Sequence, residues 1–347
     1  MTIGARVLKT GMAVALAIYV SGLLGFASPL IAAVASIFTI QPSIYRSWQQ
    51  ISDQLQTNII GAAVALAAVR LFGSTPIAIG LICILVILLS IKLKMESTIG
   101  LTLVTVVAVM EAHDAGLTFA LDRFLMVLTG MGSAFVVNVA VFPPRPRKQF
   151  SDQVHHAFDQ LSLLLRTAVS NEMKEQVFNN EKERLEATLR KLEERFSVFE
   201  EERALLPKRK AIRARQLVVS KQMIKVLQKG GDLLNAVEEH YFAAPEADEW
   251  AHRFDRHIED LTKYHEQILL KSEGKMKPSA TIEPEEAREA RLASQLVDYF
   301  GETDESRKRL MFVASAMFEY AYHLRRLEKL IDQVLQREAQ NPQKLGR

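Results

Sequence analysis

The sequence predicts an all-α protein in two parts: a bundle of six transmembrane helices over residues 1–145, followed by an antiparallel bundle of long cytoplasmic helices over residues 146–347. Two observations lead to this prediction. The first 142 residues carry only 12 charged side chains, whereas the remaining 205 residues carry 71. The first part also divides into long uncharged stretches, while the second part repeats apolar residues at the spacing of amphipathic helices.

The uncharged stretches set the bounds of the expected spans. A bilayer core about 30 Å thick needs about 20 helical residues. The first stretch, residues 10–45, is interrupted by Gly25 and Pro29, so it supplies two helices. The shorter spans need interfacial residues such as Trp48, or contacts with neighbouring helices. The six spans are expected near residues 10–26, 29–45, 55–72, 75–91, 98–114 and 121–142.

Basic residues indicate the orientation. With a cytoplasmic N-terminus, eight basic residues fall on the inner side and only Arg70 and Arg123 on the outer side, which is a positive-inside bias. Both termini are then cytoplasmic. Residues 6–24 also resemble a signal peptide, but no cleavage pattern follows near Ala27, so we expect a retained first span. The eight inner residues are Arg6, Lys9, Arg46, Lys92, Lys94, Arg145, Arg147 and Lys148.

The second part reads as a series of long helices. Further helices are expected near residues 209–241, 247–271 and 285–300, and residues 272–283 are expected to form a loop. Helices of this length could also pair between subunits as a coiled coil. Two apolar seams mark the outer members of the series: Leu185, Leu189, Leu192, Phe196, Phe199 and Leu206 in one, and Leu310, Val313, Met317, Tyr320, Leu324, Leu327, Ile331 and Val334 in the other.

Composition excludes several classes of protein. The charges of the second part nearly balance, which argues against a nucleic-acid surface. The single cysteine, Cys83, allows neither a disulfide nor a thiolate metal site within one chain. The Glu249-x-x-His252 spacing has no second copy, so a di-metal site is not expected. Phosphate loops and nucleophile elbows are absent from the sequence. We therefore expect no enzyme, metal or cofactor.

A polar cluster between the second and third spans is the first candidate for transport. It comprises Gln41, Pro42, Ser43, Tyr45 and Arg46, and it is followed by Gln54, Gln56, Thr57 and Asn58. Pro42 removes a main-chain donor, which is tolerated at membrane depth where protein or a watery cavity satisfies the freed groups. Arg46 and the amides would then bind an anion. The alternative is that Pro42 ends a helix at the interface and Arg46 extends toward the cytoplasm.

A second candidate lies at the end of the fifth span. Glu111, His113 and Asp114 would form a proton relay if they lie within the membrane. The alternative is a short helix that ends at Met110 and leaves them in an outer loop. Asn138, Thr102 and Thr105 either line a pathway or join helices by hydrogen bonds. Small residues around Gly11 and Gly61 favour close helix contacts.

Segment Ile40–Trp48, which reads IQPSIYRSW, leads into Gln56–Ala62, which reads QTNIIGA. With six spans and a helical tail, the chain resembles the Gram-positive branch of the bacterial aromatic acid exporter family, which is related to the fusaric acid resistance proteins. The resemblance implies efflux of small aromatic carboxylates by a homo-oligomer in the bacterial plasma membrane, driven by the proton gradient. Many relatives have arginine and then Gly-Thr at Gln56–Asn58, so no role of that arginine transfers.

A second hypothesis assigns the activity to the tail. In that case the chain is a membrane-anchored scaffold or sensor, and the cytoplasmic helices bind protein partners. The tail is more than half of the chain, and its long apolar seams suit association. Six spans are more than an anchor needs, which favours the exporter.

Overall fold

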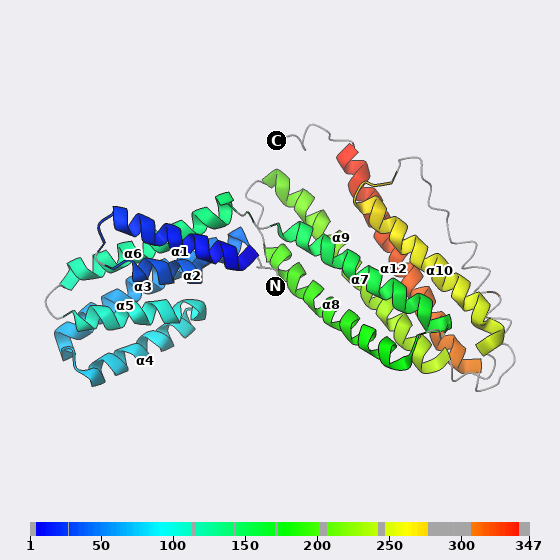
Figure 1. Cartoon of the computed structure of the whole chain (residues 1–347), viewed down its shortest axis with the longest axis horizontal. Coiled ribbons are helices and arrows are strands. Elements are labelled where there is room, and N and C mark those ends of the chain that lie inside the picture. Colours follow the sequence, from blue (N-terminus) through cyan, green and yellow to red (C-terminus); the bar gives the residue numbers. More distant parts are fainter. Residues whose placement is uncertain are drawn as a thin grey trace. The chain divides into compact units, whose positions relative to one another are not determined.

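The computed structural model describes residues 5–26, 28–112, 116–141, 143, 145–170, 173–201, 207–241, 247–276, 294 and 307–339. Every regular element among these residues is a helix, which confirms the all-α class for them. The chain divides into two compact units, Met1–Pro146 and Arg147–Arg347. Figure 1 shows the helices of both units, coloured along the chain.

Six α-helices are found among the described residues of the N-terminal unit, and they pack around three small apolar clusters. Helix α2 packs against α1 and α6, while α3 packs against α5. Two short non-α turns, η1 (Glu96–Thr98) and η2 (Val137–Val141), precede α5 and follow α6. The helices are α1 (Ala5–Leu23), α2 (Leu30–Thr39), α3 (Ile44–Phe72), α4 (Pro76–Lys92), α5 (Ile99–Glu111) and α6 (Gly116–Val136).

The second and third helices meet at a different place from the one expected. Helix α2 ends at Thr39 and α3 begins at Ile44, so Tyr45 and Arg46 lie in the first turn of α3. The expectation that the second span continues to Tyr45 and that the third begins near residue 55 was wrong. Pro42 has no N–H to continue a helix, and the Ser43 hydroxyl accepts a hydrogen bond from the Arg46 N–H (3.0 Å) as the N-cap of α3.

Three helical segments among the described residues are long and apolar enough to cross a membrane: Arg6–Leu23, Ile44–Phe72 and Thr118–Val141. Two further apolar helices, Leu30–Thr39 and Pro76–Lys92, are shorter. At 1.5 Å per residue, the ten residues of α2 extend only about 15 Å. An uncharged stretch in the sequence therefore overstates the length of the helix within it.

Two glycines let helices of the N-terminal unit approach closely. A Cβ on Gly130 of α6 would lie 2.1 Å from the carbonyl oxygen of Ala32 in α2. A Cβ on Gly61 of α3 would lie 2.8 Å from Thr102 Cγ2 in α5. Close packing at Gly61 was expected from the sequence, whereas Gly11 has open space around its Cα.

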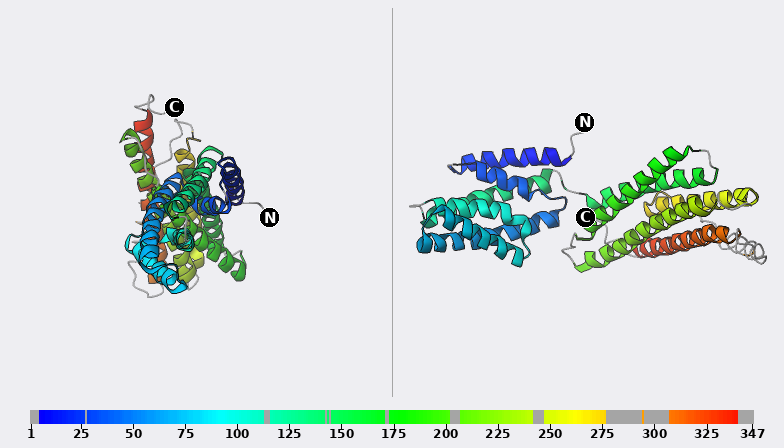
Figure 2. Two further views of the ribbon diagram at one scale, coloured as in Figure 1. Left: turned by 90° about the vertical axis from the view of Figure 1, so that its left-hand side faces the viewer. Right: turned by 90° about the horizontal axis from the view of Figure 1, so that it is seen from below.

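The C-terminal unit is built from longer helices that lie side by side (Figure 2). The described helices share one large apolar core, which includes Leu161, Leu192, Phe254 and Tyr320. The expected helix over 285–300 lies outside the described residues, apart from Ser294. The helices are α7 (Pro146–Ser170), α8 (Glu175–Glu201), α9 (Pro207–Ala236) with η3 (Val237–Tyr241), α10 (Ala247–Ser272) and α12 (Arg307–Ala339).

Helix α7 was not anticipated, although its sequence carries the signal. Phe150, Val154, Leu161, Leu165 and Ala168 recur at three- and four-residue steps or their multiples, and all are buried. Helix α9 passes through Gly230 as a continuous helix. A Cβ on Gly230 would lie 2.3 Å from Leu161 Cδ2, so this glycine makes room for the α7 side chain.

Candidate transport site

A network of side chains closes the break between α2 and α3. The Ser47 hydroxyl donates to the Thr39 carbonyl (3.2 Å) and accepts from the Gln41 N–H (3.3 Å). The Asn138 amide donates to Ser47 Oγ (2.9 Å) and to the Gln41 carbonyl (3.3 Å). Lys9 Nζ of α1 donates to Asn138 Oδ1 (2.9 Å). Main-chain groups freed by the break are thus satisfied by side chains, as an apolar surrounding requires.

Asn138 reaches this network from a π-helical turn. It lies in η2, directly after α6, and is fully buried. A π-helical turn changes the direction in which side chains leave the helix, and such turns are frequent at functional sites. Asn138 had two alternative roles in the sequence, and the structure shows the one in which it joins helices by hydrogen bonds.

A second polar layer lies farther along α3. Gln54 Nε2 donates to Thr102 Oγ1 of α5 (3.2 Å), Thr102 donates to Thr57 Oγ1 (3.0 Å), and Thr57 donates to the Asp53 carbonyl (3.0 Å). Gln54, Thr57 and Thr102 are all at least 98% buried. The layer ties α3 to α5 between apolar side chains.

Asn58 lies on the same face of α3 and is 2% exposed. Neither its Oδ1 nor its Nδ2 has a hydrogen-bond partner among the described residues, and neither has Gln54 Oε1. A buried polar group without a partner costs about 1–3 kcal/mol. Three such atoms in neighbouring turns of one helix make this face of α3 a candidate position for ligand binding.

The predicted inner residues do not form a single site. Gln41, Tyr45 and Arg46 are half-buried, Pro42 is exposed, and the buried Ser43 hydroxyl is engaged as the helix cap. Twelve residues separate Arg46 from Asn58, which is about 18 Å along a helix. Gln56 is exposed and donates to Ser52 Oγ (3.3 Å), so it faces away from Asn58.

At the other candidate site, Glu111 is the last residue of α5 and is exposed. His113 and Asp114 lie outside the described residues. The geometry of the expected proton relay therefore stays a prediction.

Sequence reasoning missed two important members of the polar network. Ser47 was read only as part of a motif, and Lys9 only as an inner basic residue. Helical spacing would have separated the glutamines: Gln54, Asn58 and Gly61 recur at four and three residues and share the face toward α5, whereas Gln56 falls on the opposite face.

Comparison with known proteins identifies the family. The model described as the fusaric acid resistance protein family matches residues 98–345. The model described as aromatic acid exporter family member 1 matches residues 1–141. Together they extend over both units.

Three relatives illustrate the similarity. UPF0421 protein YgaE of Bacillus subtilis (strain 168) is 34% identical over 347 residues, which cover 95% of each chain. UPF0421 protein OB2406 of Oceanobacillus iheyensis is 28% identical over 162 residues, 46% of each chain. A UPF0421 protein of Staphylococcus epidermidis (strain ATCC 12228) is 30% identical over 154 residues, 44% of this chain and 47% of its own.

The exporter family is a family of membrane transporters, in keeping with the three long apolar helices and with the expectation of a non-enzymatic protein. The resemblance in the IQPSIYRSW segment and the two family matches lead to the same assignment. This chain therefore belongs to the fusaric acid resistance protein family, with an N-terminal unit of the aromatic acid exporter type.

Proposed function

We propose that this protein exports small aromatic carboxylic acids across the bacterial plasma membrane, as a homo-oligomer driven by the proton gradient. Support comes from the two family matches and from the buried polar layer on α3. The single observation that carries the proposal is the buried Asn58 amide, which has no partner among the described residues and lies beside the Gln54–Thr102–Thr57 layer.

The proposed topology has six spans with both termini in the cytoplasm, and the C-terminal unit as an antiparallel bundle. The positive-inside count supports it. Exposed apolar side chains such as Leu71, Ile77 and Leu88 would face lipid. The short helices α2 and α5 would rely on their contacts with α1, α6 and α3, rather than on their own length.

Asn58 suits an aromatic acid because its side chain offers two chemistries. The Nδ2 group donates to a carboxylate, while Oδ1, together with Gln54 Oε1, accepts from a hydroxyl or a water. Apolar neighbours contact the ring: Val106 of α5 lies close to Gly61, one turn beyond Asn58. This combination of a few polar groups and apolar walls is typical of sites for small molecules.

The remaining candidates keep the roles that the sequence suggested. Arg46 and Gln41 would attract the anion at the inner end of the path, where Lys9 adds a third polar group. Glu111, with His113 and Asp114, would couple transport to protons at the outer end.

Inside-out membrane vesicles test the proposal. We expect energised vesicles to accumulate radiolabelled benzoate, salicylate or a related acid, and an uncoupler to abolish the uptake. Gln54→Leu and Asn58→Leu should each lower the initial rate about tenfold, which corresponds to the loss of one buried hydrogen bond to the substrate.

The matched control is Gln56→Leu, since Gln56 is the same residue type on the exposed face of α3. It should transport at the wild-type rate. Absence of gradient-dependent uptake for every acid in the panel would overturn the proposal. If removal of residues 148–347 abolished a protein interaction in a chain that showed no uptake, the scaffold function would replace it.

A further inference from the structure

The C-terminal unit contains a cavity of about 470 Å³, a volume within the usual range for small-molecule sites. Five helices line it, α7, α8, α9, α12 and, with its last residue, α10, together with the segment that follows α10. Its wall is mainly apolar, and polar and charged side chains supply the rest of the lining. The lining includes Phe150, Phe199, Met223, Ser220, Arg147 and Lys275.

Aromatic rings form one wall. Phe150 of α7 and Phe199 of α8 stack with ring centroids 6.0 Å apart and an interplanar angle of 24°. Both are 3% exposed, so the rings are fixed by packing. Met223 of α9 also lines the cavity, and its flexible thioether adapts to ligand shape. A flat aromatic body would therefore meet fixed aromatic groups and an adaptable thioether in the wall of the cavity.

The charged side is held in place by the end of α10. The Lys275 N–H donates to the Leu270 carbonyl (3.0 Å), and Gly274 has φ 69°, which favours glycine. This helix cap fixes the position of Lys275 relative to α10. Lys275 Nζ lies 2.7 Å from a Glu273 carboxylate oxygen, and His155 Nε2 lies 2.7 Å from the other.

The carboxylate at this side is already neutralised. The hydrogen bond from Lys275 holds the pKa of Glu273 below its ordinary value, and the bond with His155 acts in the same direction. Lys275 and Glu273 offset each other, which leaves the charge of Arg147, at the start of α7, in excess. The cavity therefore combines an apolar body with a net positive edge.

A hydroxyl adds to the polar lining. Ser220 of α9 lines the cavity and is 8% exposed. A serine hydroxyl can donate a hydrogen bond, which a bound carboxylate would accept.

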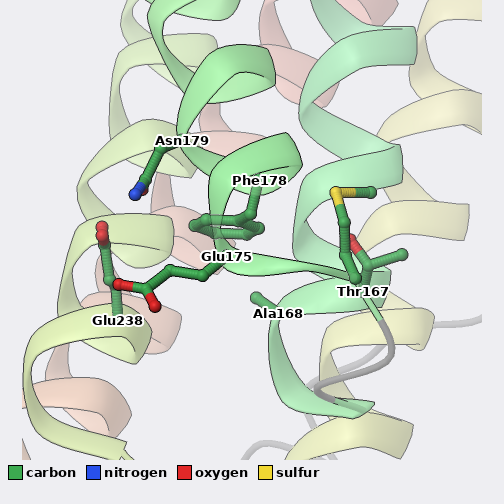
Figure 3. A pocket seen from close by; sticks show the side chains of 7 residues that line it. Thr167, Ala168, Glu175, Phe178, Asn179 and Glu238 are labelled. Atoms are coloured by element: carbon green, nitrogen blue, oxygen red, sulfur yellow. The ribbon is translucent and has the colours of Figure 1, made fainter.

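A second, smaller cavity of about 250 Å³ offers a contrast (Figure 3). Glu175 and Glu238 line it together with Phe178 and Asn179, and Lys182 pairs with Glu238. Two carboxylates against one paired lysine would repel an anion. These two cavities of the described part of the C-terminal unit thus differ in the charge of their lining.

We propose that the larger cavity binds a small aromatic carboxylate, with its ring against Phe150 and Phe199 and its carboxylate toward Arg147, Lys275 and Ser220. The ligand class rests on the proposed export function. The site is separate from the Asn58 layer and would let the C-terminal unit sense the acid. Arg147 lies at the start of α7, the helix that directly follows the N-terminal unit in the chain. A bound acid would therefore contact the first turn of α7.

Photolabelling of the full-length protein in nanodiscs tests this proposal without any need for transport. The probe is 4-benzoylbenzoate, an aromatic acid that inserts into nearby C–H bonds when illuminated. We expect peptide mass spectrometry to find the label on the peptides that contain Met223, Leu335 or Phe199. Benzoate should compete with the label, whereas uncharged benzamide should not.

Three variants and one control sharpen the test. Met223→Trp fills the cavity and should abolish labelling there. Arg147→Met and Lys275→Met should each raise the benzoate concentration that halves the labelling about tenfold, since a charge-assisted hydrogen bond is lost. Val218→Leu, on the exposed face of α9, should change nothing. Melting curves by circular dichroism establish that the variants fold.

Several outcomes would overturn the proposal: no label on these peptides, label that survives Met223→Trp in a folded protein, or equal competition by benzamide. Competition by decanoate but not benzoate would identify a fatty-acid site instead. Loss of transport in Gln54→Leu with labelling intact separates the two sites. Labelling in a protein that transports no acid would leave the sensor site standing and remove the export function.

Discussion

Tyr320 Oη and His265 Nδ1 lie 2.7 Å apart in the core of the C-terminal unit, where neither residue has exposed surface. The pair joins α12 to α10. Phe158 packs against the imidazole edge-on, with ring centroids 4.5 Å apart, and His265 Nε2 has no hydrogen-bond partner among the described residues. The imidazole is therefore held neutral in an apolar site.

This burial makes the stability of the C-terminal unit depend on pH. Burial, and secondarily the charge of His155, lower the pKa of His265 from 6.5 to about 3. The unfolded chain binds a proton below pH 6.5 and the folded chain does not, so stability falls as pH falls from about 6.5 toward 3. Between pH 7.5 and 5.5 we expect His265 to contribute a loss of about 1.4 kcal/mol.

Hydrogen exchange in peptides of α10 and α12, corrected for the intrinsic effect of pH, measures this loss. In His265→Gln the amide can still pair with Tyr320 but does not titrate. The difference in pH dependence between the two proteins isolates the histidine. Identical slopes in both would contradict the assignment.

Gly130→Ala should destabilise the N-terminal unit by about 1–3 kcal/mol, the usual range for overpacking. The new Cβ would lie 2.1 Å from the Ala32 carbonyl oxygen, and a main-chain group cannot move aside as a side chain can. Gly132→Ala, two residues along α6, meets open space and should be neutral or stabilising. Thermal unfolding in detergent compares the two, and equal melting temperatures would refute the close contact.

Asn138 and Ser47 should be energetically coupled. Their 2.9 Å hydrogen bond is buried and is one of several at the break between α2 and α3. We expect a coupling energy of about 1 kcal/mol or more from the double-mutant cycle of Asn138→Ala and Ser47→Ala. Chemical denaturation of the four proteins gives the value. Strict additivity would show that the bond does not hold the junction.

Glu328→Leu should destabilise the contact between α10 and α12 by about 1–3 kcal/mol. Glu328 accepts from the Tyr264 hydroxyl (2.6 Å) and from Lys271 Nζ (3.0 Å), so its loss removes one acceptor from each donor. Lys271 keeps its pair with Asp332 (2.8 Å). The control is Glu186→Leu, whose pair with Arg190 (3.8 Å) is exposed and should contribute about 0–1 kcal/mol. Denaturation midpoints that fall equally would contradict this ranking.

The sequence predicted the helical class because apolar spacing and charge are local properties. It misplaced the start of α3 because residues 46–58 are polar, and polarity does not prevent a main chain from being helical. Helix α7 was not predicted, because its apolar residues from Phe150 to Ala168 recur at less regular steps than those of the two seams.

The candidate site was predictable only in part. Asn58 could be named from the sequence, and its spacing from Gln54 shows that the two share a face. The bond between Lys9 and Asn138 joins residues 129 positions apart, and it depends on a π-helical turn. No local sequence pattern predicts such a turn. Whether the amide atoms of Asn58 have hydrogen-bond partners depends on the residues that surround the side chain in the folded unit, and the sequence alone does not reveal them.

The break between α2 and α3 has a mechanical consequence. No helical main-chain bond crosses residues 40–43; side-chain bonds of Ser47 and Asn138 hold the two helices instead. Exchange of those few bonds would let α2 pivot against α3 without unwinding a turn of either helix. A hinge at this junction would therefore let α2 move while the polar layer at Gln54 and Asn58 keeps its hydrogen bonds.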